Sequence, residues 1–201
     1  MDLDILKRGF KLVEYIYDSQ DLELCRIKEV GNGLAEKHWT GKQWLVDELS
    51  QCISNEDIHV AAGWLGLTSY LLRKEFPNSK ITNSDMYPGC KILSEYLFHD
   101  QNIQFKTLDT ILESDSVADT QVYVNTSIEH IPQTQVKYLL SKLKRGTTVA
   151  LQSNNYYSVD DHCNCCKDLN EFIYKTPIRD ILYSGEMSFT NHDRYMIIGV
   201  I

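Results

Sequence analysis

The stretch "IHVAAGWLGLTSYLL", Ile58 to Leu72, decides the class of fold. Its first five residues are a short apolar run typical of a buried strand, and residues 68–76 have a helical pattern that ends before Pro77. Gly63 and Gly66 stand between the two. Glycines at a strand-to-helix turn let a ligand approach the backbone, where the free N–H groups of the helix favour a carboxylate. The alternative is tight packing of the strand on the helix.

The same alternation of strand and helix continues along the chain. Strands are expected at residues 58–62, 79–85, 103–109, 120–127 and 147–154, and helices at residues 68–76, 90–100 and 133–143, with a weak turn or short helix near Ile111. A helix at 169–174 precedes two strands, 181–189 and 194–201, joined by the short segment "TNHD". Alternation predicts parallel βαβ units, and the closing hairpin predicts an antiparallel last strand. We expect an α/β fold, with a Rossmann-like, seven-stranded, mostly parallel sheet that has helices on both faces.

A helical extension is expected before the sheet. Residues 3 to about 29 carry apolar side chains at helical spacing, and "GNG" at 31–33 interrupts them. Residues 38–53 form a further expected helix, in which Thr40 and Gln43 have the spacing of a capping box. No repeat or linker divides the chain, so we expect one domain over residues 1–201, with N-terminal helices in 1–55 and the cofactor-binding core in 56–201.

Composition excludes several classes of protein. The chain has 201 residues, 43% of them hydrophobic and 24% charged, as in a soluble globular protein. The net charge of −8 disfavours a generic nucleic-acid binder, because it repels phosphate backbones. The basic segment "SKLKRG" at 141–146 fits the solvated end of a helix. The sequence has neither an apolar run long enough to span a bilayer nor a signal-peptide pattern at its start, which predicts a cytoplasmic protein with no membrane partner.

Three of the six cysteines lie together in "DHCNCCKD", beside His162. Thiolate and imidazole are zinc ligands, but zinc sites usually combine two distant ligand pairs, and a second pair is missing from this sequence. We therefore predict no metal site and reduced thiols at Cys163, Cys165 and Cys166.

Asp85 follows Gly63 by 22 residues and ends the second expected strand. An acidic residue about 20 residues after a glycine-rich turn binds the ribose hydroxyls in dinucleotide folds. This spacing predicts a nucleoside-containing ligand. A solvated turn or a helix N-cap is the alternative for Asp85.

The order of these motifs resembles that of class I S-adenosylmethionine-dependent methyltransferases, over about residues 56–201. "VAAGWLG" stands at the family's glycine-rich loop, although its G-x-G-x-G is reduced to Gly63 and Gly66, with Ala61 at the first glycine's place and Trp64 in the middle. Asp85, Asp109 and "VNTSIEHI" stand at the family's positions after the second, third and fourth strands. More narrowly, "HWTGKQWLVDEL", "GWLG", "NTSIEHI", "LQSNNYY" and "RYMIIG" resemble methyltransferase-like proteins of bacteria and phages. A phage-encoded protein would work in the host cytoplasm.

The resemblance implies S-adenosyl-L-methionine as the cofactor. Asp85 would bind its ribose, and Asp109 its adenine amino group, unless Asp109 caps the segment that starts at Ile111. The implied cofactor-binding residues are Ala62, Gly63, Trp64, Gly66, Asp85, Met86, Asp109, Thr110, Asn125 and Thr126.

The segment after the fourth strand would lie beside the methyl group. Methyl transfer depends mainly on alignment, and an acceptor that carries a proton also needs a base. We expect Asn125 to position the acceptor and His130 to act as the base, with Glu129 in reserve. A helix start and simple packing are the alternatives for Glu129 and His130.

Four further side chains are candidates for the pocket. Trp39, Tyr156 and Tyr157 are possible pocket walls or simply core and rim, and Lys42 either contacts the cofactor carboxylate or lies on the surface. The leading interpretation is a methyltransferase with a small-molecule acceptor. The alternatives are a nucleic-acid methyltransferase, a non-catalytic S-adenosylmethionine-binding module and a nicotinamide-dependent oxidoreductase.

Overall fold

A seven-stranded sheet in the order β3-β2-β1-β4-β5-β7-β6 forms the centre of the protein. The computed structural model describes residues 2–18 and 24–201. The neighbouring strands from β3 to β5 are parallel, and β7 runs antiparallel to both β5 and β6. The strands are β1 (Ile58–Ala61), β2 (Ile81–Asp85), β3 (Gln104–Thr107), β4 (Val122–Asn125), β5 (Thr148–Asn154), β6 (Asp180–Ser188) and β7 (Asp193–Val200). This arrangement confirms the predicted sheet.

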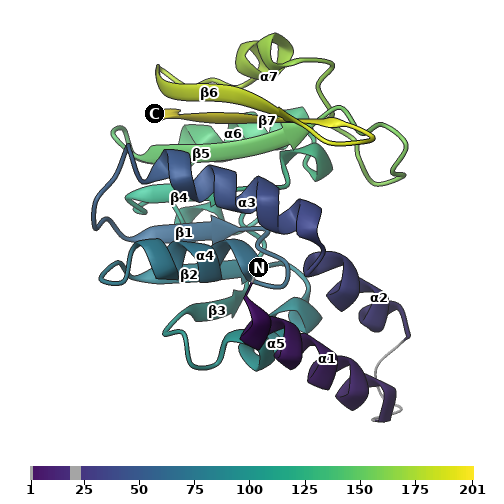
Figure 1. The fold of residues 1–201 in the computed structure, drawn as a ribbon. Coiled ribbons are helices and arrows are strands. Elements are labelled where there is room, and N and C mark those ends of the chain that lie inside the picture. Colours follow the sequence, from purple (N-terminus) through teal and green to yellow (C-terminus); the bar gives the residue numbers. More distant parts are fainter. Residues whose placement is uncertain (1, 19–23) are drawn as a thin grey trace.

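Helices cover both faces of the sheet. They are α1 (Leu3–Asp18), α2 (Leu24–Gly33), α3 (Glu36–Leu49), α4 (Leu67–Glu75), α5 (Pro88–Phe98), α6 (Gln133–Lys142) and α7 (Leu169–Lys175), with two 3-10 helices, η1 (Ser114–Ser116) and η2 (Ile128–His130). In Figure 1, α3 lies across the front of the sheet and α6 lies behind it. None of the helices in residues 2–18 and 24–201 is both long and apolar enough to cross a membrane.

The side chains of the central strands alternate between two hydrophobic clusters. In β4, Val122 and Val124 pack with helices α1 to α5, whereas Tyr123 packs with α6 and α7 on the other face. β1 and β4 are buried along their whole length, as expected for parallel strands covered on both sides. The carboxyl ends of β1, β2, β4 and β5 therefore meet at one edge of a double-sided core.

The N-terminal extension differs in detail from its prediction. Helix α2 continues through Gly31 to Gly33, and the junction between α1 and α2 at residues 19–23 lies outside the described residues. The predicted capping box of Thr40 and Gln43 is wrong, because α3 begins earlier, at Glu36. The Thr40 hydroxyl instead donates to the Glu36 carbonyl, 3.0 Å away within the helix.

Candidate functional site

The loop between β1 and α4 has an unusual backbone. Ala62, Trp64 and Gly66 have φ angles of 49°, 46° and 81°, in the left-handed region. Only Gly66 enters this region without strain, and strained residues of this kind concentrate at binding and catalytic sites. A side chain at Gly63 would place its Cβ 2.0 Å from the Oδ1 atom of Asn83. Packing against β2 therefore accounts for Gly63.

Asp85 connects this loop to the end of β2. Its Oδ2 atom accepts a hydrogen bond from the backbone N–H of Trp64 (3.0 Å), and its Oδ1 atom accepts one from the N–H of Tyr87 (3.1 Å). A carboxylate has about four acceptor positions, so each oxygen can accept one more bond. The next residue, Met86, is exposed. The predicted spacing from Gly63 thus corresponds to direct contact between Asp85 and the glycine loop.

Two polar groups near the start of α4 have no hydrogen-bond partner among the residues that the structure describes. They are the Thr68 hydroxyl in the first turn and the indole N–H of Trp39 on α3, and both are buried. Gly66 is the N-cap of α4 and supplies no side-chain cap. Trp39 also packs edge-on against Tyr70 within the core, which was the alternative to a place in the pocket wall. Unpaired buried donors are uncommon and indicate a missing partner.

Asp109 caps the segment that starts at Ile111, which was the alternative to binding the adenine amino group. Its Oδ1 atom accepts hydrogen bonds from the backbone N–H groups of Ile111 (2.9 Å) and Leu112 (3.1 Å), at the start of a turn. The adjacent Thr110 is buried.

Asn125 and Thr126 end β4 beside β1, where Asn125 pairs with Ala61. The Asn125 side chain is buried, and its Oδ1 atom accepts from the N–H of Ser127 (2.8 Å). Its amide is therefore used to shape the loop. The Thr126 hydroxyl accepts from the ammonium group of Lys42, 3.1 Å away, so Lys42 is directed into the protein.

A buried network of charges lies at the same edge of the sheet. Arg194 donates to the Thr126 carbonyl (3.0 Å) and contacts the Oε1 atom of Glu129 (3.5 Å). Asn154, at the end of β5, donates to the same oxygen (2.6 Å). Burial, followed by the charge of Arg194, lowers the pKa of Lys42 to about 7, while Glu129 acts in the opposite direction. Lys42 is therefore an uncommon lysine that can lose its proton near neutral pH.

Sequence reasoning missed Arg194 and Asn154. Asn154 ends the expected fifth strand, and a polar residue at that end of a parallel strand could have indicated a site residue. Arg194 begins the last strand, and an antiparallel strand begins where its parallel neighbours end. Arg194 therefore lies at the site edge beside Asn154, a position that could have been inferred from the expected strand order but was not.

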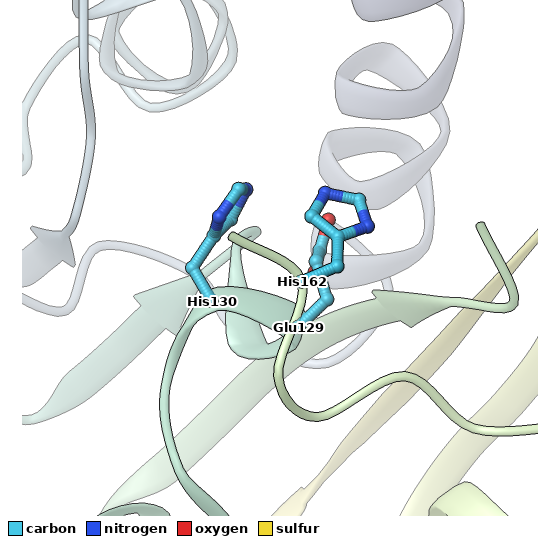
Figure 2. Close-up of side chains that lie close together, drawn as sticks. All are labelled: Glu129, His130 and His162. Atoms are coloured by element: carbon cyan, nitrogen blue, oxygen red, sulfur yellow. The ribbon is translucent and has the colours of Figure 1, made fainter. Parts of the chain in front are cut away.

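His130 and His162 face each other beside Glu129 at the mouth of this edge (Figure 2). The His130 ring is exposed, with Nδ1 3.1 Å from Oδ2 of Asp161. Tyr156 is partly buried and stacks on His192, whereas Tyr157 is largely exposed. Tyr156 therefore lies against the histidines, and Tyr157 lies on the rim.

The cysteine cluster contacts the same loops. Burial raises the pKa of the Cys165 and Cys166 thiols to about 11, and Cys163 is exposed. Cys165 is 3.5 Å from Oδ1 of Asn154. Burial therefore favours the protonated form of both thiols.

The N-terminal helices cover the glycine loop. A side chain at Gly33, the last residue of α2, would collide with Leu65. His38 on α3 packs edge-on against Trp64, and burial, followed by the charge of Lys42, lowers the pKa of His38 to about 3. Helices α2 and α3 therefore form one wall of the site with uncharged rings.

Several solved structures have a similar fold. The magnesium protoporphyrin IX methyltransferase ChlM of Synechocystis PCC 6803, solved with bound SAM, matches with a TM-score of 0.61 and 15% identity over 100% of this chain and 97% of that one. The N-methyltransferase NodS of Bradyrhizobium japonicum WM9 matches with a TM-score of 0.64 and 11% identity, over 80% and 94% of the two chains. Coclaurine N-methyltransferase, solved with N-methylheliamine and SAH, has a TM-score of 0.58 and 12% identity.

The match to coclaurine N-methyltransferase covers 75% of this chain and 51% of that enzyme, so the chain spans about half its length. No protein-family model and no curated protein sequence matches the chain. Identities of 11–15% carry information about architecture alone. The chain therefore has the Rossmann-like fold of these methyltransferases.

Proposed function

We propose that the protein is a class I S-adenosylmethionine-dependent methyltransferase that acts on a small-molecule acceptor. The observation that carries the proposal is the contact of Asp85 with a strained glycine loop, in a sheet of methyltransferase topology. The free acceptor position on each Asp85 oxygen suits one of the two ribose hydroxyls. The sheet order differs from the all-parallel 3-2-1-4-5-6 order of nicotinamide-binding folds, which disfavours the oxidoreductase interpretation.

The residues around the loop fit the rest of the cofactor. The uncapped N-terminus of α4, with the unpartnered hydroxyl of Thr68, provides donors for a carboxylate. The ammonium group of Lys42, beside Thr126 at the end of β4, is a further donor at this edge. When bound, S-adenosylmethionine supplies a sulfonium-linked methyl group.

The chain's own part in transfer is to align the acceptor and to remove its proton. The buried Asn125 fixes the loop that carries Glu129 and His130. His130 is our preferred base because its ring is exposed at the site mouth and an imidazole nitrogen can accept the proton of an acceptor. Glu129 is the reserve candidate. The net charge of −8 favours a small-molecule acceptor over a nucleic acid, because it repels a phosphate backbone.

The test is calorimetry with S-adenosylhomocysteine on the wild type and Asp85→Ala. One hydrogen bond to a charged group is worth about 1.5–3 kcal/mol, so loss of the Asp85 carboxylate should weaken binding by at least about ten- to a hundredfold. Asp119→Ala is the matched control, because Asp119 is an exposed carboxylate paired only with Lys144 in the described interactions. Unchanged affinity in a folded Asp85→Ala variant, or a thermal shift with NAD and none with S-adenosylmethionine, would overturn the proposal.

A further inference from the structure

Glu129, His130 and His162 bring three metal-ligating groups together in the structure. One nitrogen of each ring and one carboxylate oxygen lie within 4.8 Å of one another. Glu129 and His130 come from η2, and His162 comes from the loop between β5 and α7 (Figure 2). The two loops are joined by hydrogen bonds from the N–H groups of Cys163 and Asn164 to the Glu129 carbonyl, both 2.9 Å long.

In the part of the chain that the structure describes, both rings make their hydrogen bonds through Nδ1. Nδ1 of His162 lies 2.7 Å from the Tyr156 carbonyl, and Nδ1 of His130 lies 3.1 Å from the Asp161 carboxylate. Both partners are acceptors, so Nδ1 must carry the proton in each ring. Nε2 then keeps its lone pair, which is the state in which histidine binds a metal.

The third group is a buried carboxylate with one unpaired oxygen. Glu129 is only 2% exposed, and its Oε1 atom is held by Asn154 and Arg194. Its Oε2 atom is buried without a hydrogen-bond partner among the described residues. A buried carboxylate oxygen without a partner is costly, and a cation beside it would remove that cost.

We propose that Glu129, His130 and His162 bind a divalent transition-metal ion such as Mn²⁺, Co²⁺ or Zn²⁺. Two imidazole nitrogens and one carboxylate oxygen suit these ions. With metal–ligand distances of about 2.1 Å, the ligand atoms must approach to roughly 3–3.5 Å, so binding of the ion would draw the three side chains together. This proposal departs from the sequence-based prediction of no metal site, and it places the ion at residues other than the three clustered cysteines.

The inference rests on the proposed function and specifies the acceptor as a hydroxyl compound. Three protein ligands leave positions open for an acceptor hydroxyl, whose pKa a divalent ion lowers. The proton leaves to solvent, and an oxygen lone pair forms the bond to the methyl carbon. The carbon–sulfur bond breaks with its electron pair kept by sulfur, which gives S-adenosylhomocysteine. In this arrangement His130 is a metal ligand, and the ion replaces it in activating the acceptor.

The test is titration of the full-length, chelator-treated protein with CoCl₂, followed by visible absorption and calorimetry. We expect one Co²⁺ per chain and at least tenfold weaker binding in His130→Ala and in His162→Ala. His99→Ala is the matched control, because His99 is an exposed histidine at the end of α5 and is not one of the three proposed ligands. Glu129→Gln, checked for folding by circular dichroism, should also lose binding.

Two results would overturn the inference: absence of Co²⁺ binding in the wild type, or equal binding in the wild type and both histidine variants. S-adenosylhomocysteine binding, measured on the same samples without metal, separates this failure from failure of the proposed function. Protein that binds Co²⁺ through these residues but not S-adenosylhomocysteine supports the metal site and refutes the cofactor assignment.

Discussion

Replacing Lys42 by Met should change how the stability of the protein depends on pH. Lys42 is partly buried on α3, where its ammonium group donates to Thr126. Burial, with the charge of Arg194 second, lowers its pKa from 10.5 to about 7. The unfolded chain therefore binds more protons than the folded chain between pH 7 and pH 10.5, and the free energy of unfolding rises with pH across this range.

The size of the effect follows from the two pKa values. Between pH 7 and pH 9, Lys42 should add about 2 kcal/mol to the free energy of unfolding. Below pH 7 the amine becomes protonated in both states, so the dependence levels off. Methionine keeps a similar hydrocarbon chain without a titrating group, and the variant should lack this rise.

The assay is urea unfolding, followed by circular dichroism, at pH 7, 8 and 9. The quantity of interest is the difference in free energy of unfolding between the wild type and Lys42→Met, since the other titrating groups are common to both. Lys37→Met is the matched control, because Lys37 is an exposed lysine on the same helix. Parallel curves for the wild type and Lys42→Met would refute the reasoning.

Three further predictions concern the loops around the site. Gly63→Ala should destabilise the protein by about 1–3 kcal/mol in urea unfolding, because its Cβ would lie 2.0 Å from Oδ1 of Asn83. A second substitution, Asn83→Ala, should restore part of this lost stability. If Gly63→Ala alone left the stability unchanged, the packing argument would be wrong. His130→Ala should lower single-turnover methyl transfer by about 10²–10⁴-fold once an acceptor is identified, with nearly unchanged S-adenosylhomocysteine affinity. A wild-type rate would contradict a role for His130 in activating the acceptor, either as the base or as a metal ligand. Cys163→Ser and Cys165→Ala should leave the metal content of the purified protein unchanged, as measured by elemental analysis, and a loss of metal in either variant would implicate the cysteines.

The sheet could be predicted from the sequence because its signals are local. The central parallel strands β1, β2 and β4 are short buried runs, and Gly66 and Pro77 mark the ends of the helix that follows β1. The start of α3 was missed because Ala35 caps it without a side-chain hydrogen bond, so the sequence contained no capping signal there. Thr40 and Gln43 have the spacing of a capping box, but Thr40 lies inside the helix.

The candidate site was only partly predictable, because its contacts join distant segments. The position of Asp85 followed from spacing, but its bond to the N–H of Trp64 depends on the left-handed conformation of Trp64, which residue type alone does not indicate. The pairing of Glu129 with Arg194 spans 65 residues and two loops. Tertiary contacts of this kind become visible only when the strand order is known.

The position of β7 between β5 and β6 also determines when the sheet can be completed. Residues 193–200 are the last strand in the chain, yet they pair with strands on both sides. During synthesis, β5 must wait with one unpaired edge until these residues emerge, and such an edge is a template for pairing with other chains. Arg194 arrives with the same strand, so the buried carboxylate of Glu129 makes its ion pair with Arg194 only after these residues are synthesised. Closure of the sheet and the ion pair between Arg194 and Glu129 therefore both depend on the same eight residues, 193–200.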